Sequence, residues 1–451
     1  MAISANASIL AMLKVYYKDG VENLMFRNSP VLKKIKKERV EGKTQNFSAM
    51  YGRGGAVGGD FTKAQANAAT VSKAVEFAVE PGQIFSVYSM NSKEVQASQT
   101  KRGAYMKIAG AKMFAASESF RKTLAAALYG SGYGEICLAP AASFTSGTVA
   151  TITLPDYAIM AIDIGSKLEV KATLASSTKK VTLTVEAIDG NSVSVTPDTT
   201  ASSLATDYIV LEGSTDGNNG ILPVGLAGWL PTKRNTITAG SSFFGVDRSV
   251  AKDRLAGAFY DATSNTNEKK SVSVQKLIQK CRRQGSQADL IILNDEDFMA
   301  FSDEIQATNT YFTQTSTKEK RSANVGFDKF SASFSTNYIE NIVDDPYCPK
   351  GRFYVLDTEY VALWTYTNTD KINDGVEGNN PGKQNPMEMD GEGKTETPYG
   401  LIIDDYLNIQ PGTSTINGPA MDVTLQMFGS FVVTNPSVCG VGKFYGADAF
   451  A

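Results

Sequence analysis

The sequence predicts an α+β protein that carries an inserted domain built of strands. Three observations lead to this prediction. Residues 92–129 have the apolar spacing of one long helix, residues 136–215 contain five or six short alternating strands, and residues 271–305 follow a helix, strand, helix order. Because a chain of 451 residues is longer than one hydrophobic core usually serves, we expect several subdomains.

The composition argues against several classes of function. No histidine occurs in the chain, which rules out Ser-His-Asp and Cys-His catalysis and histidine-based metal sites. The net charge of −3 argues against a dedicated nucleic-acid binder, and no run of 18 apolar residues predicts a membrane span. The cysteines lack C-x-x-C spacing, so we expect buried free thiols at Cys137, Cys281, Cys348 and Cys439.

The first 41 residues are expected to form an arm with an apolar face. Apolar side chains recur at helical spacing from Ile9 to Tyr17, and "VENLMFRNSPVL" follows. The next stretch, "KKIKKERVEGK", holds six basic and two acidic residues. Mixed charge runs are usually solvated, so we expect a solvated segment here; the alternative is an electrostatic contact with an acidic neighbour.

A glycine-rich stretch, "YGRGGAVGG" at residues 51–59, is expected to be a bend and not a phosphate loop. Neither G-x-G-x-x-G nor G-x-x-x-x-G-K-[ST] is satisfied, because Val57 and Asp60 occupy the required positions. The flanking "KTQNFSAMY" and "VSKAVEFAV" and the later "QIFSVYSM" have strand-like patterns. Glycine tolerates positive φ, so the run suits the tip of a long excursion that becomes ordered against a neighbour.

The long helix over residues 92–129 has recognisable ends. Asn91 and Glu94 have the spacing of a capping pair, and Gly130 is expected to end the helix. At 1.5 Å per residue, it would be roughly 57 Å long. One apolar stripe is expected to pack against a sheet or a neighbouring chain, and it consists of Tyr105, Ala109, Met113, Ala116, Phe120, Leu124 and Leu128.

From about residue 136 the chain changes to short strands bounded by turn residues. The expected strands are "TVATITL", "SKLEVKATL", "KKVTLTVEA", "NSVSVT" and "DYIVLEG", with "IDGN" as a hairpin turn. So many strands in about 80 residues predict a small barrel or sandwich. It lacks an aromatic series or a basic stripe, so a structural or surface-display role is favoured over polysaccharide or oligonucleotide binding.

The remainder of the chain predicts an α/β layer. We expect "SVSVQKLIQKCRRQ" to be a helix, "ADLIILN" a buried strand, and "NDEDFMAFSDEI" a helix capped by Asn294. Later strands are "RFYVLDTEYVALW" and "MDVTLQMFGSFVVT", and the polar residues 367–398 between them are expected to be a surface loop.

Little in the chain points to catalysis or metal binding. Neighbouring acids occur at 344–345 and 404–405, but no second motif supports an acid/base role. The stretches "DGEGKTE" and "NDGVEGNN" lack the spacing of a calcium-binding loop. We therefore expect no catalytic residue, cofactor or metal ligand.

The order of these parts resembles the major capsid protein of tailed double-stranded-DNA bacteriophages, the Hong Kong 97-type capsid fold. Local similarities are "LKVYYKDGVENLMFRNSPVL", "GLAGWLPT", "ADLIILND", "FYVLDTEYVALW" and "VVTNPSVCGV". The resemblance implies an N-terminal arm (1–41), an extended E-loop hairpin (42–90), a peripheral domain with a spine helix (91–135), an inserted β-barrel domain (136–220), an axial domain with return strands of the peripheral domain (221–420) and a C-terminal peripheral-domain strand (421–451).

The resemblance also implies which residues contact neighbouring subunits. The E-loop tip would supply Tyr51, Gly52, Arg53, Gly54, Gly55 and Asp60. The arm would supply Tyr16, Tyr17, Phe26 and Arg27. Some members of the family join lysine to asparagine across subunits, and Lys63 or Lys73 with Asn435 are the residues such a link would use, although no motif assigns them.

The implied function is a structural one. The chain would assemble into pentamers and hexamers of an icosahedral head in the virion, built in the host bacterial cytoplasm, that encloses double-stranded DNA without sequence-specific binding. Portal and scaffolding proteins, and a decoration or head-fibre protein, would be its partners. The alternatives are a bacterial encapsulin-type cargo shell protein, and another phage structural protein such as a tail tube or sheath subunit.

Overall fold

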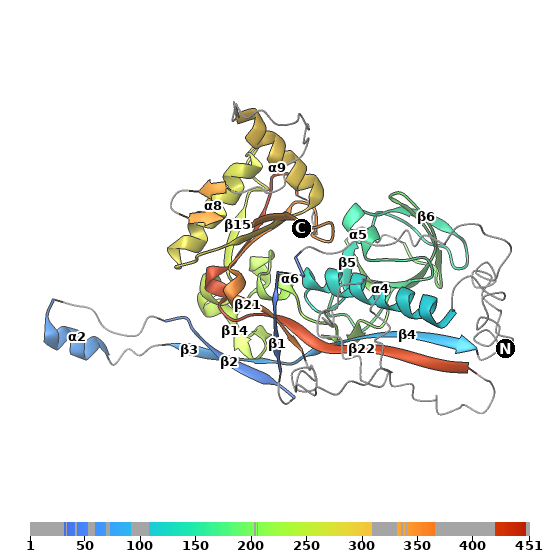
Figure 1. Ribbon diagram of the computed structural model, residues 1–451, viewed down its shortest axis with the longest axis horizontal. Helices are drawn as coiled ribbons and strands as arrows, with labels where there is room; N and C mark the ends of the chain where they lie inside the picture. The colour runs from blue at the N-terminus through green and yellow to red at the C-terminus, as the bar shows by residue number, and fades with distance from the viewer. Residues whose placement is uncertain are drawn as a thin grey trace, which may run out of the picture.

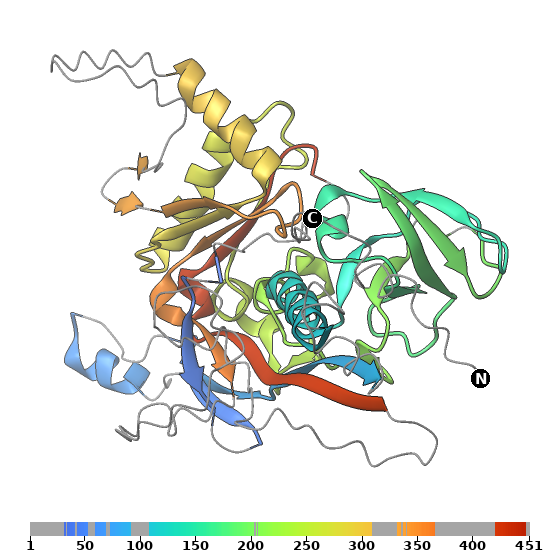
Figure 2. The same cartoon turned by 45° about the vertical axis from the view of Figure 1, so that its right-hand side comes forward.

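The computed structural model arranges the chain in three main sheets and one hairpin that leaves the body (Figures 1 and 2). This is a mixed α/β architecture. The structure describes residues 31–32, 34–40, 43–52, 59–68, 73–91, 108–202, 204, 206–308, 332–334, 337–339, 341–365 and 420–447.

A four-stranded sheet with one long helix forms the base of the molecule. Its strands, in spatial order, are β1 (Lys36–Arg39), β21 (Val361–Thr365), β22 (Ala420–Val433) and β4 (Gly82–Asn91). The helix α4 (Ile108–Leu128) lies beside β4 and β22 (Figure 1). The Ser86 hydroxyl on β4 donates a hydrogen bond to the Ala116 carbonyl oxygen of α4 at 3.2 Å, which fixes the helix on the sheet.

The predicted end and apolar stripe of the long helix are confirmed where the structure describes them. The helix stops at Leu128, two residues before Gly130. Phe120, Leu124 and Leu128 are buried, as is Ala116. The expected start, with Glu94 as a capping residue, lies outside the described residues, and Asn91 is the last residue of β4.

Residues 135–211 form a separate six-stranded antiparallel sheet with its own hydrophobic core. Its strands, in spatial order, are β5 (Glu135–Leu138), β10 (Tyr208–Leu211), β7 (Lys167–Lys171), β8 (Val181–Asp189), β9 (Ser192–Pro197) and β6 (Ala150–Thr153). The five strands expected from alternation are confirmed. The "IDGN" turn between β8 and β9 is also confirmed, with Gly190 at a φ of 55°.

The expected barrel is not closed. Its edge strands β5 and β6 are each four residues long, and within the described residues no strand pairing joins them. A single bridge between Phe144 and Ala201 lies outside the named strands. The inserted domain is therefore an open sheet whose core is covered in part by the short helix α5 (Asp156–Met160), with Tyr157 and Ala158 buried.

A five-stranded mixed sheet forms the third unit, with two helices packed on it (Figure 2). Its strands, in spatial order, are β15 (Ala258–Asp261), β23 (Gly440–Lys443), β20 (Arg352–Leu356), β16 (Leu290–Leu293) and β19 (Asn341–Asp344). Helices α8 (Lys270–Arg283) and α9 (Asp295–Thr308) match the predicted helices. The Asn294 side chain caps α9 by accepting a hydrogen bond from the Glu296 amide at 3.1 Å.

The apolar strand β16 is buried on both faces, as its sequence predicts. Ile291 and Leu293 pack in one cluster with α8 and α9, whereas Leu290 and Ile292 belong to the large central core. Successive side chains of a strand point to opposite faces, so a strand covered on both sides must be apolar throughout. This strand joins the helical layer to the rest of the molecule.

The C-terminal segment differs from the single strand expected over residues 421–451. It forms two strands in two different sheets, β22 and β23, joined by a 3₁₀ turn at Pro436–Val438. Proline has no backbone N–H and cannot continue a ladder, so the chain leaves the four-stranded sheet here and enters the five-stranded one.

The projecting hairpin consists of β2 (Gln45–Met50) and β3 (Ala74–Val79), paired from Gln45 opposite Val79 to Met50 opposite Ala74. The helix α2 (Phe61–Ala68) lies between them and farthest from the body (Figure 1). The third strand-like stretch, "QIFSVYSM", is not part of the hairpin. It lies in β4 and pairs with β22 over ten residue pairs.

Candidate inter-subunit surfaces

An aromatic cluster fixes the base of the hairpin to the body. Phe47 of β2 stacks on Phe77 of β3 at a centroid distance of 5.2 Å. Trp229 contacts both rings, at 5.8 Å and 5.4 Å, and Trp364 of β21 meets Phe47 edge-on at 5.8 Å. Trp229 and Phe77 have no exposed surface, so this end of the hairpin is part of the core.

Four hydrogen bonds extend this anchor toward the tip. The Ala78 amide donates to the Phe244 carbonyl oxygen at 3.0 Å, and the Arg254 guanidinium donates to the Tyr51 carbonyl oxygen. The amides of Tyr51 and Gly52 both donate to the Lys73 carbonyl oxygen at 3.0 Å. Tyr51, expected at the tip, is therefore held partly buried at the end of the paired strands, where Gly52 continues the pairing.

The far part of the hairpin is a helix that the sequence analysis missed. Asp60, expected to contact a neighbour, caps α2: its Oδ1 accepts hydrogen bonds from the amides of Thr62 at 2.9 Å and Lys63 at 3.4 Å. An aspartate directly before the helix-compatible run "FTKAQANA" is the signal that could have found this helix. Arg53, Gly54 and Gly55 lie outside the described residues.

Large apolar side chains are exposed on this projecting part. Met50 at the end of β2 is 66% exposed and Phe61 at the start of α2 is 79% exposed. Lys63 and Lys73 are also exposed there. Large apolar side chains exposed on a hairpin that extends away from the core have the character of a contact surface for another molecule.

The described part of the N-terminal arm is an edge strand. β1 pairs in parallel with β21, from Lys36 opposite Ala362 to Arg39 opposite Thr365. The Glu38 carboxylate accepts a hydrogen bond from the Trp364 indole at 2.9 Å. The buried side chains of this segment are Val31, Leu32, Ile35 and Val40.

The expectation of a solvated segment is correct for Lys34, Lys36, Lys37 and Glu38, which are exposed, and wrong for Ile35 and Val40, which are buried. Its apolar residues anchor the strand in the core, while Lys36 and Lys37 stay exposed. The arm residues expected to contact neighbours, Tyr16, Tyr17, Phe26 and Arg27, lie outside the described residues.

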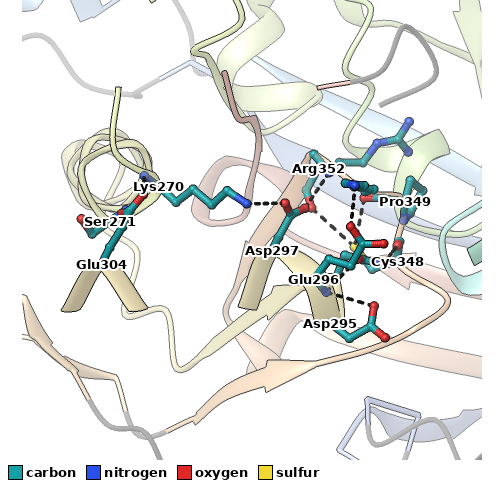
Figure 3. Close-up of polar contacts among 12 residues, drawn as sticks. Lys270, Ser271, Asp295, Glu296, Asp297, Glu304, Cys348, Pro349 and Arg352 are labelled. Atoms are coloured by element: carbon teal, nitrogen blue, oxygen red, sulfur yellow. Dashed lines mark hydrogen bonds and ion pairs between the residues drawn. The ribbon is translucent and has the colours of Figure 1, made fainter. Parts of the chain in front are cut away.

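Polar contacts link α8, α9 and the turn before β20 (Figure 3). The Lys270 ammonium pairs with Asp297 at 2.7 Å, and the Asp297 carboxylate accepts from the Gly351 amide at 2.6 Å. Glu304 accepts from the amides of Lys270 and Ser271, at 3.0 Å each, and so complements the N-terminus of α8. These acids support the fold.

The remaining candidates for chemistry have structural roles. Asp345 is fully buried and its carboxylate accepts from the Tyr347 amide at 3.0 Å, which stabilises a turn. The four cysteines are free and buried, as predicted.

Within the described ranges, no three acidic or cysteine side chains gather in an arrangement suited to a metal ion. No helix among the described residues has the length and apolar character that a bilayer crossing requires.

No protein-family model and no curated protein matches this sequence. Several solved structures match the fold of this chain. The capsid asymmetric unit of cyanophage A-1(L) is 12% identical, with a TM-score of 0.53 over 95% of this chain and 96% of that one. The chain has the fold of a phage capsid protein.

Two further solved structures are similar at a lower level. A protein of mycobacterium phage Adephagia is 8% identical, with a TM-score of 0.39 over 98% of this chain and 99% of that one. The SrpI encapsulin complex of Synechococcus elongatus PCC 7942 is 7% identical, with a TM-score of 0.40 over 97% and 94%. Of these three, the cyanophage capsid is the one whose TM-score shows the shared fold.

Proposed function

We propose that this chain is the repeating subunit of an icosahedral phage head, where pentamers and hexamers of it enclose double-stranded DNA. The capsid fold supports a shell-forming role. The observation that carries the proposal is the hairpin: its base is locked into the core by Phe77 and Trp229, while Met50 and Phe61 are exposed beyond it. A hairpin fixed at one end and apolar at the other is built to cover a neighbouring copy.

In this proposal each of the three main sheets belongs to a different domain of the capsid subunit. The four-stranded sheet with α4 is the peripheral domain and the five-stranded sheet with α8 and α9 is the axial domain, which gathers at capsomer centres. The six-stranded sheet is an inserted domain on the shell. The hairpin is the E-loop, with Tyr51, Gly52 and Asp60 shaping the approach to its tip. Residues 53–55 and the arm residues Tyr16, Tyr17, Phe26 and Arg27 contact adjoining subunits.

This role is structural and not catalytic. Many modest contacts, each repeated around symmetry axes, add through multivalency to a closed shell. A near-neutral chain suits the enclosure of DNA, because a strongly basic inner surface would hold the packaged DNA too tightly. Portal and scaffolding proteins are the partners proposed for such a head, and a decoration or head-fibre protein is an optional one.

The test is assembly of the full chain, observed by electron microscopy. We expect closed shells from the unsubstituted protein, alone or with the scaffolding protein of its genome. Phe61→Ser should leave the melting temperature unchanged, because Phe61 contacts no core, but should reduce shell yield at least tenfold. Val149→Ser is the matched control: Val149, in the inserted domain, is 59% exposed, and its substitution should leave both properties unchanged.

The alternatives give different particles. Helical tubes would identify a tail tube or sheath subunit and refute the head proposal. Shells that form in the cell around a protein cargo, with no requirement for phage DNA, would identify an encapsulin-type compartment. A chain that stays monomeric at high concentration with scaffolding protein present would refute all three.

A further inference from the structure

A cleft of about 270 Å³ lies where the inserted domain meets the segment after it. Its walls come from the entry to β5, from β10, from residues 227–236, from Phe243 and Arg248, and from Arg352 at the start of β20. This volume is slightly below the range typical of small-molecule sites. The cleft therefore suits a small ion or a single side chain, with water, better than a cofactor.

The charges that line this cleft are unbalanced. Lys233, Arg248 and Arg352 contribute three positive charges, whereas Glu135 is the one acidic residue among the described residues that line it. Arg248 is 8% exposed and Arg352 is 4% exposed, so neither charge is fully screened by solvent. Clefts with one sign of charge and low-dielectric walls concentrate ions of the opposite sign.

The positive potential extends around the cleft. Burial lowers the pKa of Lys443, and the nearby charges of Arg352 and Lys233 lower it further, against the opposing effect of Asp261. Burial likewise lowers the pKa of Arg248 to about 10, with a further contribution from Arg234. Burial is the larger cause of both shifts, and the smaller contributions show that Arg352 and Lys233 repel Lys443 and that Arg234 repels Arg248.

Two of the cations have defined positions. The Arg248 guanidinium donates to the Gly228 and Trp229 carbonyl oxygens at 2.8 Å and 3.2 Å and lies 3.9 Å from the Phe243 ring centre, so it is held as part of the wall. Lys233 is exposed, and its ammonium donates to the Tyr208 hydroxyl at 2.6 Å, on the facing strand β10. Lys233 is therefore the cation that can turn toward a ligand without breaking the core.

We propose that this cleft is an oxyanion site, which takes a phosphate or carboxylate group between Lys233 and the walls that hold Arg248 and Arg352. An oxyanion there would lie among three cations, Lys233, Arg248 and Arg352, whose charge Glu135 only partly balances. The inference stands on the cleft alone and does not require the chain to form a shell.

Inorganic phosphate is the probe. Isothermal titration calorimetry of the full chain, at constant ionic strength set with potassium chloride, should give saturable binding of one phosphate per chain. Lys233→Gln should weaken the affinity about tenfold, and Glu135→Gln should tighten it several-fold, because each removes one charge next to the ligand. Lys167→Gln is the control: Lys167 is an exposed β7 lysine, paired with Glu212 at 3.9 Å, and the affinity should not change.

The two substitutions have opposite expected signs, and the Lys167→Gln control separates a local effect from a general change in net charge. Neither substitution is expected to disturb folding. Lys233 is exposed, and a glutamine at position 135 keeps a side-chain oxygen that can accept the hydrogen bond from the Ser131 amide, 2.5 Å long in the unsubstituted chain. Non-saturating heats, or one affinity shared by all four proteins, would overturn the proposal. A parallel titration with acetate separates the sources: tighter binding of phosphate than of acetate indicates a phosphoryl ligand, whereas tighter binding of acetate indicates a carboxylate from an acidic protein segment.

Discussion

The Trp229 indole donates a hydrogen bond to the Phe431 carbonyl oxygen at 2.8 Å, across 202 residues of sequence. Both residues are fully buried. Trp229 lies in the short helix α6 (Leu226–Trp229) and Phe431 in β22, and the indole also contacts Phe47, Phe77, Phe243 and Phe244. One side chain thus joins the four-stranded sheet, the hairpin and the segment that holds Phe243 and Phe244.

Trp229→Phe is expected to destabilise the fold by about 1–3 kcal/mol, because the Phe431 carbonyl oxygen is left buried without this donor. Chemical denaturation gives the value. Hydrogen exchange should show the larger increase in the amides of β2 and β3, which pack on the indole. Tyr445→Phe, at an aromatic residue 44% exposed, is the control and should change stability by less than about 0.5 kcal/mol. If the amides of β2 and β3 exchanged at the same rate in Trp229→Phe as in the unsubstituted protein, the indole would not be what holds the hairpin to the body.

Gly442→Ala is expected to destabilise the five-stranded sheet by about 1–3 kcal/mol through overpacking. Gly442 lies opposite Phe353, and a Cβ at this position would overlap the Phe353 ring. That ring cannot move aside, because it is buried and stacked on Phe444 at 4.3 Å. Gly59→Ala is the matched control, since a Cβ there meets nothing within 4 Å. Equal melting temperatures of the two variants would show that the ring yields.

The sequence predicted best the elements whose burial is periodic. Alternation located β6 to β10, and the fully apolar run located β16, because each pattern reflects a burial that neighbouring residues share. The sequence did not predict β1, because its residues are mostly charged and its partner strand lies about 326 residues away. It also did not predict α2, because this helix packs on no core and so has no apolar stripe. The cleft around Lys233 was also missed, since Arg352 is distant in sequence from Lys233 and Arg248.

The four thiols are expected to resist alkylation in the native protein. Burial raises the pKa of Cys137 and Cys439 to about 12 and raises the pKa of Cys281 and Cys348 as well. The thiolate is the reactive form, so almost none is present at about pH 8. Mass spectrometry after iodoacetamide treatment should find the native chain unmodified and the denatured chain modified at all four cysteines. Rapid native labelling of any of them would contradict the buried positions.

Glu135→Gln is expected to stabilise the chain at neutral pH. The Glu135 Oε2 atom is buried without a hydrogen-bond partner, and burial raises the pKa of this carboxyl despite its hydrogen bonds and the charge of Arg352. A carboxyl whose pKa is higher in the folded state binds its proton more tightly there, so stability falls as the pH rises through the unfolded and then the folded pKa. The cost is therefore present at neutral pH and absent below the unfolded pKa of about 4.3.

Melting temperatures measured from neutral to acidic pH test this sign. The variant should melt above the unsubstituted protein at neutral pH, and the difference should shrink toward zero in acid. Glu212→Gln, at an exposed carboxylate 3.9 Å from Lys167, should show a small difference at every pH, because surface pairs contribute little. A variant less stable than the unsubstituted protein at neutral pH would mean that the attraction to Arg352 outweighs the cost of burying the Glu135 charge.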